Sequence, residues 1–352
     1  MEQRKITALD AGQRLDKYLH KLMPEASDSF VYKMLRKKNI VLNGKKAEGN
    51  VKIACDDIIT LFLSDETFLK FGGKRSGQDI AVRQNKTAEQ IKISKELTVL
   101  FENEHVLLIN KPAGLLTQKA KADDYSLNEW LVGYLTEKGT LTEDALQTFR
   151  PSACNRLDRN TSGIVLCSKT VAGAQLLGEL LQKRMIHKYY RTYVKGCLEK
   201  EQTIEGYLKK DTTTNKVTVK PVLQDDLHAD AAINLNTGAV KTEKNVSNLG
   251  DYIKTRYIPI KQVQDKTFLE VELITGKPHQ IRAHLASIGH PLLGDYKYGD
   301  PEWNSEYRKK YKISHQLLHA YRVEFPILEA PFEDLSDASF TAPLPDLFLK
   351  LE

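Results

Sequence analysis

The first 66 residues alternate hydrophobic and polar positions at the periods of two short helices and a hairpin. The segment RLDKYLHKLM repeats leucine at helical spacing, and SDSFVYKMLRKK places its apolar residues on one helical face, with basic residues opposite. The sequence IVLNGKKA predicts a tight hairpin, because Asn-Gly suits the positive backbone angles of a type I′ turn. The strand IITLFL follows. We expect residues 1–66 to fold as one small module.

Beyond this module the pattern first fades and then becomes that of a larger domain. Residues 67–98 lack steady periodicity and contain two adjacent glycines, which is typical of a linker. Strand-like runs such as VLLIN, KYYRTYVKG and FLEVELITG then alternate with helix-like runs at about 171–185 and in KPHQIRAHLASIG. Residues 211–250 are polar and irregular, which indicates a variable insertion or a long hairpin.

The order of these elements predicts an α+β fold. The larger domain spans residues 99–352, with a core at about 99–330 and a C-terminal tail. Four prolines between Pro326 and Pro345 favour an extended tail that wraps this domain. Helices that alternate with strands and hairpins predict a mixed or antiparallel sheet with flanking helices.

The composition is that of an ordinary globular chain. Of the 352 residues, 41% are hydrophobic and 28% charged. No apolar run approaches the roughly 18 residues that a membrane span needs, and MEQRKITALD has no apolar core of a signal peptide. The four cysteines lie far apart without a paired metal spacing, which suits reduced thiols in a cytoplasm. We therefore expect a cytoplasmic protein without a membrane anchor.

The formal net charge of +6 matters because the basic residues are concentrated near the N-terminus. Residues 33–46 contain six basic residues and no acid, and residues 67–98 add seven basic residues against three acids. The first group consists of Lys33, Arg36, Lys37, Lys38, Lys45 and Lys46. A solvated helix face is the ordinary interpretation of such a run, but this one continues from the helix onto the hairpin. It therefore predicts a polyanionic partner such as RNA.

Several kinds of chemistry find no support in the sequence. His279 and His284 are five residues apart and do not share a helical face, while Gln316 stands between His315 and His319 where a zinc protease needs glutamate. No phosphate-binding GxxxxGK[ST] or GxGxxG motif and no GxSxG nucleophile elbow is present. We expect neither a metal nor a cofactor.

What remains is a carboxylate among cations. The stretch CNRLDRNTSG places Asp158 between Arg156 and Arg159, directly before the apolar run IVLCSK. An aspartate held beside arginine stays ionised, which suits a nucleophile better than a general acid. Taken alone, however, the motif favours an ordinary salt bridge in a surface loop.

Four longer blocks resemble the RluA-type pseudouridine synthases. They are NKPAGLLT, NRLDRNTSGIVLCSKT, KYYRTYVKG and LITGKPHQIRAHLASIGHPLLGDYKYG, in that family's order across about residues 99–330. Residues 12–66 are similar to the S-four-type RNA-binding module, which precedes the catalytic domain in many members that act on ribosomal RNA. Pseudouridine formation requires no metal, redox group or nucleotide cofactor.

The resemblance implies a role for each matching residue. Asp158 corresponds to the indispensable aspartate, and Arg282 to the arginine that pairs with it. Tyr190 matches the tyrosine that packs on the flipped base and helps to remove its carbon-5 proton, although Tyr189 is adjacent. Arg156 resembles the arginine that fills the space left by the flipped uridine. The remaining expected RNA contacts are Lys277 and His279, together with Lys33, Arg36, Lys37, Lys38, Lys45 and Lys46.

Two positions depart from the family pattern. Asn155 stands where many members have histidine, and Lys277 where arginine is commoner, which removes the bidentate fork of a guanidinium. Neither change affects Asp158 or Arg156. The resemblance implies an RNA isomerase that acts on large-subunit ribosomal RNA, and a monomer is the default expectation. The alternatives are a transfer-RNA substrate, a non-catalytic RNA-binding factor in ribosome assembly and, more distantly, a metal hydrolase.

Overall fold

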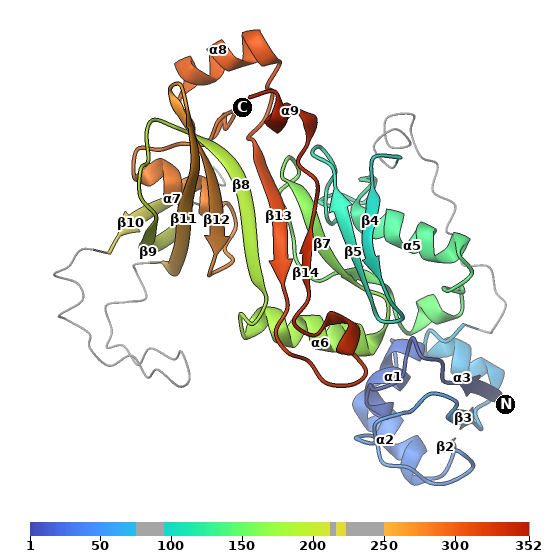
Figure 1. The fold of residues 1–352 in the computed structure, drawn as a ribbon. Coiled ribbons are helices and arrows are strands. Elements are labelled where there is room, and N and C mark those ends of the chain that lie inside the picture. The colour runs from blue at the N-terminus through green and yellow to red at the C-terminus, as the bar shows by residue number, and fades with distance from the viewer. Residues whose placement is uncertain (75–94, 212–215, 223–249, 352) are drawn as a thin grey trace. The chain divides into compact units, whose positions relative to one another are not determined.

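The computed structural model describes residues 1–74, 95–211, 216–222 and 250–351. Its chain divides into two compact units, each built from segments that are distant in sequence (Figure 1). The first unit comprises Met1–Lys111, Leu115–Arg156 and Val165–Gln182, and the second comprises Pro112–Gly114, Leu157–Ile164 and Lys183–Glu352. Most of the expected linker and of the expected insertion at 211–250 lies outside the described residues.

The first unit begins with the small module expected from the sequence. Three short strands form an antiparallel sheet in the order β1-β3-β2, and two helices pack against it. The elements are β1 (Glu2–Lys5), α1 (Leu15–Leu22), α2 (Asp28–Arg36), β2 (Ile40–Leu42) and β3 (Ile58–Leu61). The Ser27 hydroxyl caps α2 by accepting a hydrogen bond from the backbone N–H of Phe30. Both predicted helices are confirmed.

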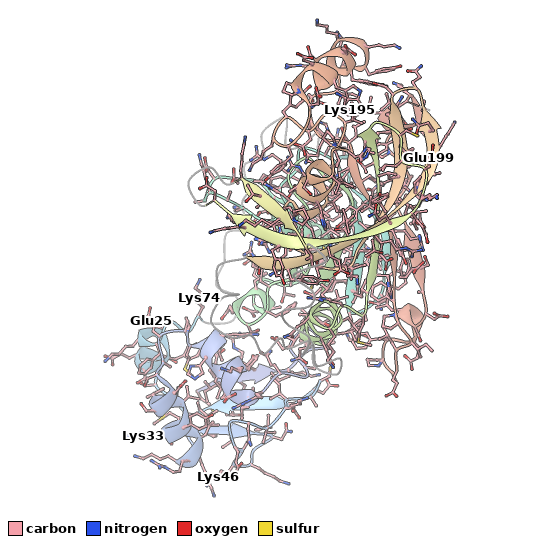
Figure 2. The ribbon with its side chains drawn as sticks, turned by 90° about the vertical axis from the view of Figure 1, so that its left-hand side faces the viewer. Glu25, Lys33, Lys46, Lys74, Lys195 and Glu199 are labelled. Carbon is pink, nitrogen blue, oxygen red and sulfur yellow. The ribbon has the colours of Figure 1, made fainter. Side chains whose placement is uncertain are left out.

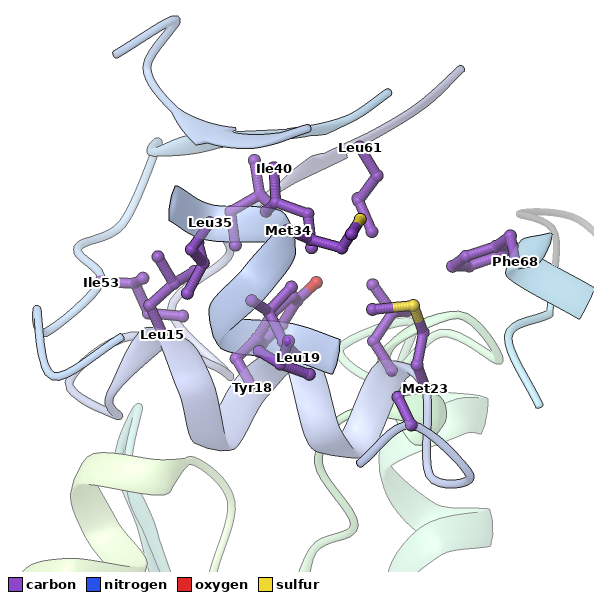
Figure 3. Close-up of a cluster of buried hydrophobic side chains, with 14 of the residues drawn as sticks. Leu15, Tyr18, Leu19, Met23, Met34, Leu35, Ile40, Ile53, Leu61 and Phe68 are labelled. Carbon is purple, nitrogen blue, oxygen red and sulfur yellow. The ribbon is translucent and has the colours of Figure 1, made fainter. Parts of the chain in front are cut away.

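The core of this module extends beyond residue 66. A short helix, α3 (Asp65–Lys70), places Phe68 among the leucines and isoleucines contributed by the other elements (Figure 3). Asn43 and Gly44 have the positive φ angles expected of the tight turn. The chain after this turn does not form a second strand of a hairpin, because Lys45 meets Leu42 in a single isolated bridge and β2 pairs with β3 instead.

The rest of the first unit consists of strands and helices, among which the strand β5 is almost completely buried. The antiparallel strands β4 (Thr98–Glu102) and β5 (Val106–Lys111) are followed by the helix α5 (Leu127–Glu137). The 3-10 turn η1 (Ala145–Gln147), the strand β6 (Ser152–Ala153), the later part of β7 (Ser162–Ser168) and the helix α6 (Val171–Gln182) complete it. The predicted helix at about 171–185 is confirmed as α6, with Leu177 and Leu180 buried.

The second unit contains a large mixed sheet. Its strands run antiparallel in the order β10-β9-β11-β12-β8-β13, and β13 also pairs in parallel with the first residues of β7. The bounds are β8 (His187–Lys195), β9 (Gln202–Lys210), β10 (Val217–Pro221), β11 (Asp251–Val263), β12 (Lys266–Leu273), β13 (Leu318–Glu324) and β14 (Ser339–Thr341). This mixed sheet with helices confirms the predicted α+β class.

Helices and the C-terminal tail complete the second unit. The helix predicted in KPHQIRAHLASIG is confirmed as α7 (Gln280–Ser287), which packs against β9, β10 and β11 through Ala283. The other elements are α8 (Pro301–Tyr311), the 3-10 turn η4 (Glu333–Leu335) and α9 (Asp346–Leu349). The tail contains the strand β14, which pairs with β13, and the short helix α9, in which Phe348 is buried against Tyr193.

Candidate active site

Asp158 lies in the turn that leads into β7. The backbone N–H of Thr161 donates to the carbonyl oxygen of Asp158 at 3.0 Å, which closes the turn. Gly163 then has a φ of +107°, and a Cβ at this position would lie 2.2 Å from the carbonyl oxygen of Ala320 on β13. Only glycine permits this close approach of the two strands. The sequence Asn-Thr-Ser-Gly therefore fixes where Asp158 stands just before β7.

Arg282, on α7, joins two carboxylates. Its Nη1 donates to Oδ2 of Asp158 at 2.9 Å, while Nε and Nη2 donate to the two oxygens of Asp295 at 2.7 and 3.0 Å. The Arg282 side chain is 9% exposed, that of Asp158 is 29% exposed, and that of Asp295 is completely buried. The bidentate contact orients the guanidinium so that its remaining edge points at Asp158.

Within this trio, the charges of Asp295 and Arg282 are stabilised by their contacts. Burial opposes the ionised form of Asp295, yet hydrogen bonds from Arg282 and from the backbone N–H groups of Lys297 and Tyr298 lower the pKa of its carboxyl group. Burial likewise opposes the charge of Arg282, while the contacts with Asp295 and Asp158 raise the pKa of its guanidinium. Arg282 and Asp295 are therefore both charged at neutral pH.

His279 stands beside this trio in an unusual backbone conformation. It precedes α7 with a φ of 57° and a ψ of 13°, and its Nε2 lies 3.8 Å from Oδ2 of Asp158. Its Nδ1 forms a 2.8 Å hydrogen bond with the hydroxyl group of Tyr298, whose ring also lies 5.2 Å from the guanidinium carbon of Arg282. Burial lowers the pKa of His279, which favours the neutral imidazole.

The two neighbouring tyrosines of β8 have different surroundings. Tyr190 is 6% exposed, and burial, with a smaller contribution from the charge of Asp158, raises the pKa of its phenol. Tyr189 instead donates a hydrogen bond to Glu324 and stacks under Arg322. Tyr190 is thus the buried ring of the pair, and Tyr189 is the half-buried one, with Glu324 and Arg322 as its partners.

The other predicted site residues have different surroundings. The ammonium group of Lys277 pairs with the carboxylate of Asp251 at 2.7 Å. Arg156 belongs to the first unit and is exposed. The six basic residues of the N-terminal module are all exposed, and Figure 2 labels two of them, Lys33 and Lys46.

Sequence reasoning missed Asp295 and Tyr298. Both lie in HPLLGDYKYG, the end of the fourth block, to which no role was attached. An aspartate directly after an apolar run is a signal of a buried carboxylate, and a buried carboxylate needs a cation. Finding that cation requires the fold, because α7 brings Arg282 back to the loop that contains Asp295.

The residues that the structure describes show neither a metal site nor a membrane span. No group of three or more potential metal ligands occurs among them. None of the described helices is both long and apolar enough to cross a bilayer.

The comparison with known families identifies the kind of protein. Residues 105–287, just over half of the chain and including Asp158, Tyr190 and Arg282, match the family described as RNA pseudouridylate synthase. The chain belongs to this family. It is therefore an enzyme of the isomerase class, and the expectation from its four sequence blocks is confirmed.

Individual relatives agree with this assignment. Ribosomal large subunit pseudouridine synthase C of Rickettsia bellii is 30% identical over 82% of this chain and 83% of its own length. The protein of the same name from Vibrio cholerae is 25% identical over 90% of this chain and 85% of its own. The solved structure of human RNA pseudouridylate synthase domain containing 4 covers 73% of this chain with a TM-score of 0.55 at 20% identity, which shows a shared fold.

Proposed function

We propose that this pseudouridine synthase isomerises specific uridines in large-subunit ribosomal RNA and that Asp158 is its reacting carboxylate. The observation that carries the role of Asp158 is its 2.9 Å ion pair with Arg282, which Asp295 holds from the other side. The ribosomal substrate is supported by relatives named large-subunit pseudouridine synthases, similar over most of their length. We also propose that the protein works in the cytoplasm and as a monomer.

The reaction moves a bond without adding or losing atoms. The bond between N1 of uracil and C1′ of ribose breaks, the base turns, a bond forms between C5 and C1′, and the proton on C5 leaves while N1 gains one. Attack of the carboxylate on the base, attack on C1′ and removal of a proton from C2′ all require ionised Asp158. Arg282 pairs with this carboxylate and fixes the direction of its oxygens.

The surrounding residues have distinct proposed roles. Tyr190 packs against the flipped uracil, and its raised pKa keeps the phenol protonated, so contact with the base suits it better than proton removal. Arg156, exposed in the first unit, takes the place of the base in the RNA stack. Lys277, His279 and the basic residues of the N-terminal module contact RNA, mostly through phosphates.

The test compares cells that lack the gene with cells that carry either the wild-type copy or Asp158→Ala. Pseudouridines in total RNA are mapped at single-nucleotide resolution. We expect the same large-subunit sites to disappear in the null strain and in the Asp158→Ala strain. Sites lost from transfer RNA would replace the ribosomal substrate with a transfer-RNA substrate. If all sites persist in both strains, the proposal fails.

A further inference from the structure

A groove of about 700 Å³ lies on the N-terminal module, between α2 and the chain that follows the Asn43-Gly44 turn. Three of the six basic side chains expected to contact RNA line it, namely Lys33, Arg36 and Lys46, together with one carboxylate, Glu48. Lys33 and Lys46 are at the same end of the module in Figure 2. The groove therefore has an excess of positive charge and favours an anionic ligand.

A tyrosine is fixed within this groove. Tyr32 lines it and is 46% exposed, which is high for a ring of this size. Its hydroxyl group donates to Oδ2 of Asp16 at 2.7 Å. Asp16 is buried and also accepts hydrogen bonds from Nε and Nη2 of Arg14 at 3.1 and 2.5 Å. The end of the ring is therefore held by a network of its own module.

Gly49 provides the seat for this ring. A Cβ at Gly49 would lie 2.8 Å from Cε1 of Tyr32 and 3.1 Å from Cβ of Asp16, so any larger residue would displace them. The tyrosine consequently rests directly on the backbone of Gly49. The ring is already held by its hydroxyl group and packed on Gly49. A planar ligand can therefore stack on it with little further loss of side-chain conformational entropy.

We propose that this groove binds an unpaired RNA nucleotide, with its base stacked on Tyr32 and its neighbouring phosphates at Lys33, Arg36 and Lys46. An aromatic ring beside several cations is the combination that recognises single-stranded nucleic acid, because every base has a flat face and every nucleotide a phosphate. A duplex offers the phosphates but hides the faces of its bases. The inference rests on the proposed function, and it adds recognition of a second nucleotide by a unit other than the one that contains Asp158.

The test measures the affinity of the full-length protein for two fluorescent RNAs with equal numbers of phosphates. One is a hairpin with a uridine-rich loop, and the other is a fully paired duplex. Tyr32→Ala should weaken binding of the hairpin on the order of tenfold and leave the duplex unchanged. Tyr32→Phe keeps the ring but lacks the hydroxyl group that Asp16 holds, so it should retain most of the affinity for the hairpin and bind the duplex like the wild type. Gly49→Ala should reproduce the selective loss.

The salt dependence separates stacking from charge. Tyr32→Ala should leave the slope of log affinity against log salt unchanged, whereas Lys33→Ala should reduce it by about one. Phe62→Ala removes an aromatic residue of similar exposure, 54%, that does not line the groove, and should have no effect. Equal losses for hairpin and duplex in Tyr32→Ala, or no loss at all, would overturn the proposal.

The proposed function is tested separately with Asp158→Ala. This variant should bind the hairpin like the wild type but form no pseudouridine. A wild-type protein that prefers the loop through Tyr32 yet leaves ribosomal RNA unmodified would disprove the ribosomal substrate only. If the wild type modifies ribosomal RNA normally but Tyr32→Ala binds the hairpin as tightly as the wild type, only the proposal for the groove is disproved.

Discussion

At the scale of single residues, Arg282 is the group on which the orientation of Asp158 depends. Its guanidinium donates to Asp158 through one edge and to Asp295 through another. Asp295 has no exposed surface and also accepts hydrogen bonds from two backbone N–H groups. In the proposed mechanism Asp295 is therefore a positioning residue, because it holds Arg282 and has no contact of its own with Asp158 among those described.

Asp295→Asn should impair catalysis more than binding. The amide keeps the shape of the side chain but lacks the charge and one acceptor oxygen, so Arg282 is released from its fixed orientation. We expect kcat to fall on the order of 100-fold with KM nearly unchanged. Asp300→Asn is the matched control, because Asp300 caps α8 and asparagine caps a helix equally well. An Asp295→Asn enzyme with normal kcat would contradict this role.

The structure also explains Asn155, which replaces a histidine common in the family. Its Oδ1 accepts a hydrogen bond from the backbone N–H of Leu166 at 2.8 Å, and Leu166 is fully buried. The position requires an acceptor for this N–H group and no positive charge. Asparagine meets that requirement, as a neutral imidazole nitrogen would.

Asn155→Ala should lower the stability of the fold. It leaves the N–H group of Leu166 without an acceptor, which costs on the order of 1–3 kcal/mol. Asn155→His offers a ring nitrogen and should recover much of this loss. Thermal unfolding followed by circular dichroism compares the three proteins. Equal melting temperatures for the alanine variant and the wild type would show that this hydrogen bond is dispensable.

At the scale of elements, the pairing of β7 with β13 depends on Gly163. A side chain there would meet the backbone of Ala320, and the φ of +107° is strained for any other residue. Gly163→Ala should destabilise the protein by about 2 kcal/mol or more. A Cβ added at Gly178, inside α6, would meet no atom within 4 Å, so Gly178→Ala should stabilise by up to about 1 kcal/mol. If the melting temperatures of Gly163→Ala and Gly178→Ala shift in the same direction from that of the wild type, this prediction is wrong.

The basic face of α2 and the residue that follows it should contribute much of the affinity for RNA. Reversing the charge of Lys33, Arg36 and Lys37 with glutamate should weaken RNA binding and make it less sensitive to salt, because fewer counterions are released. The matched control reverses three exposed lysines of the second unit, Lys309, Lys310 and Lys312. Filter binding at several salt concentrations measures both variants. Equal losses of RNA affinity in the two variants would mean that RNA binding does not depend specifically on α2.

Most elements could be predicted because their signals are local. The Asn43-Gly44 turn follows from the preference of that dipeptide for positive φ, and α6 and α7 follow from short apolar periods. The pairing partner of β2 could not be predicted, since β3 arrives only after an irregular stretch of chain. The burial of Phe68 was missed for a different reason: its six-residue helix contains too few positions to show a period.

At the scale of the whole molecule, the fold should lose stability in mild acid. Burial lowers the pKa of His284 and of His319 to about 4, so both remain neutral in the folded protein while the unfolded chain takes up protons near pH 6.5. The stability that they contribute is complete above about pH 6.5 and is lost as the pH falls through about 4. Each loses on the order of 2 kcal/mol over this interval.

Melting temperatures measured between about pH 7 and about pH 4 test this expectation. Asparagine at position 284 or 319 takes up no proton, and it keeps a polar atom for the hydroxyl group of Thr255 or Ser162. His284→Asn and His319→Asn should therefore show a smaller fall in melting temperature than the wild type. Parallel curves for all three proteins would exclude these histidines as the cause.

The candidate site could be predicted only in part, because its members come from different parts of the chain. The resemblance names Asp158 and Arg282, which are 124 residues apart and lie 2.9 Å from each other in the fold. Asp295 carries no motif of its own, and its importance appears only when α7 folds back against its loop.

The contact between Arg282 and Asp295 also means that these two side chains are already ordered before RNA binds. Because both partners are fixed in the RNA-free protein, their conformational entropy is lost during folding and not during the encounter with substrate. In the proposed mechanism the carboxylate of Asp158 is thus preorganised, and binding energy from the RNA remains available for extracting the uridine from its stack. The proposal therefore couples catalytic rate to folding stability through one buried side chain, that of Asp295.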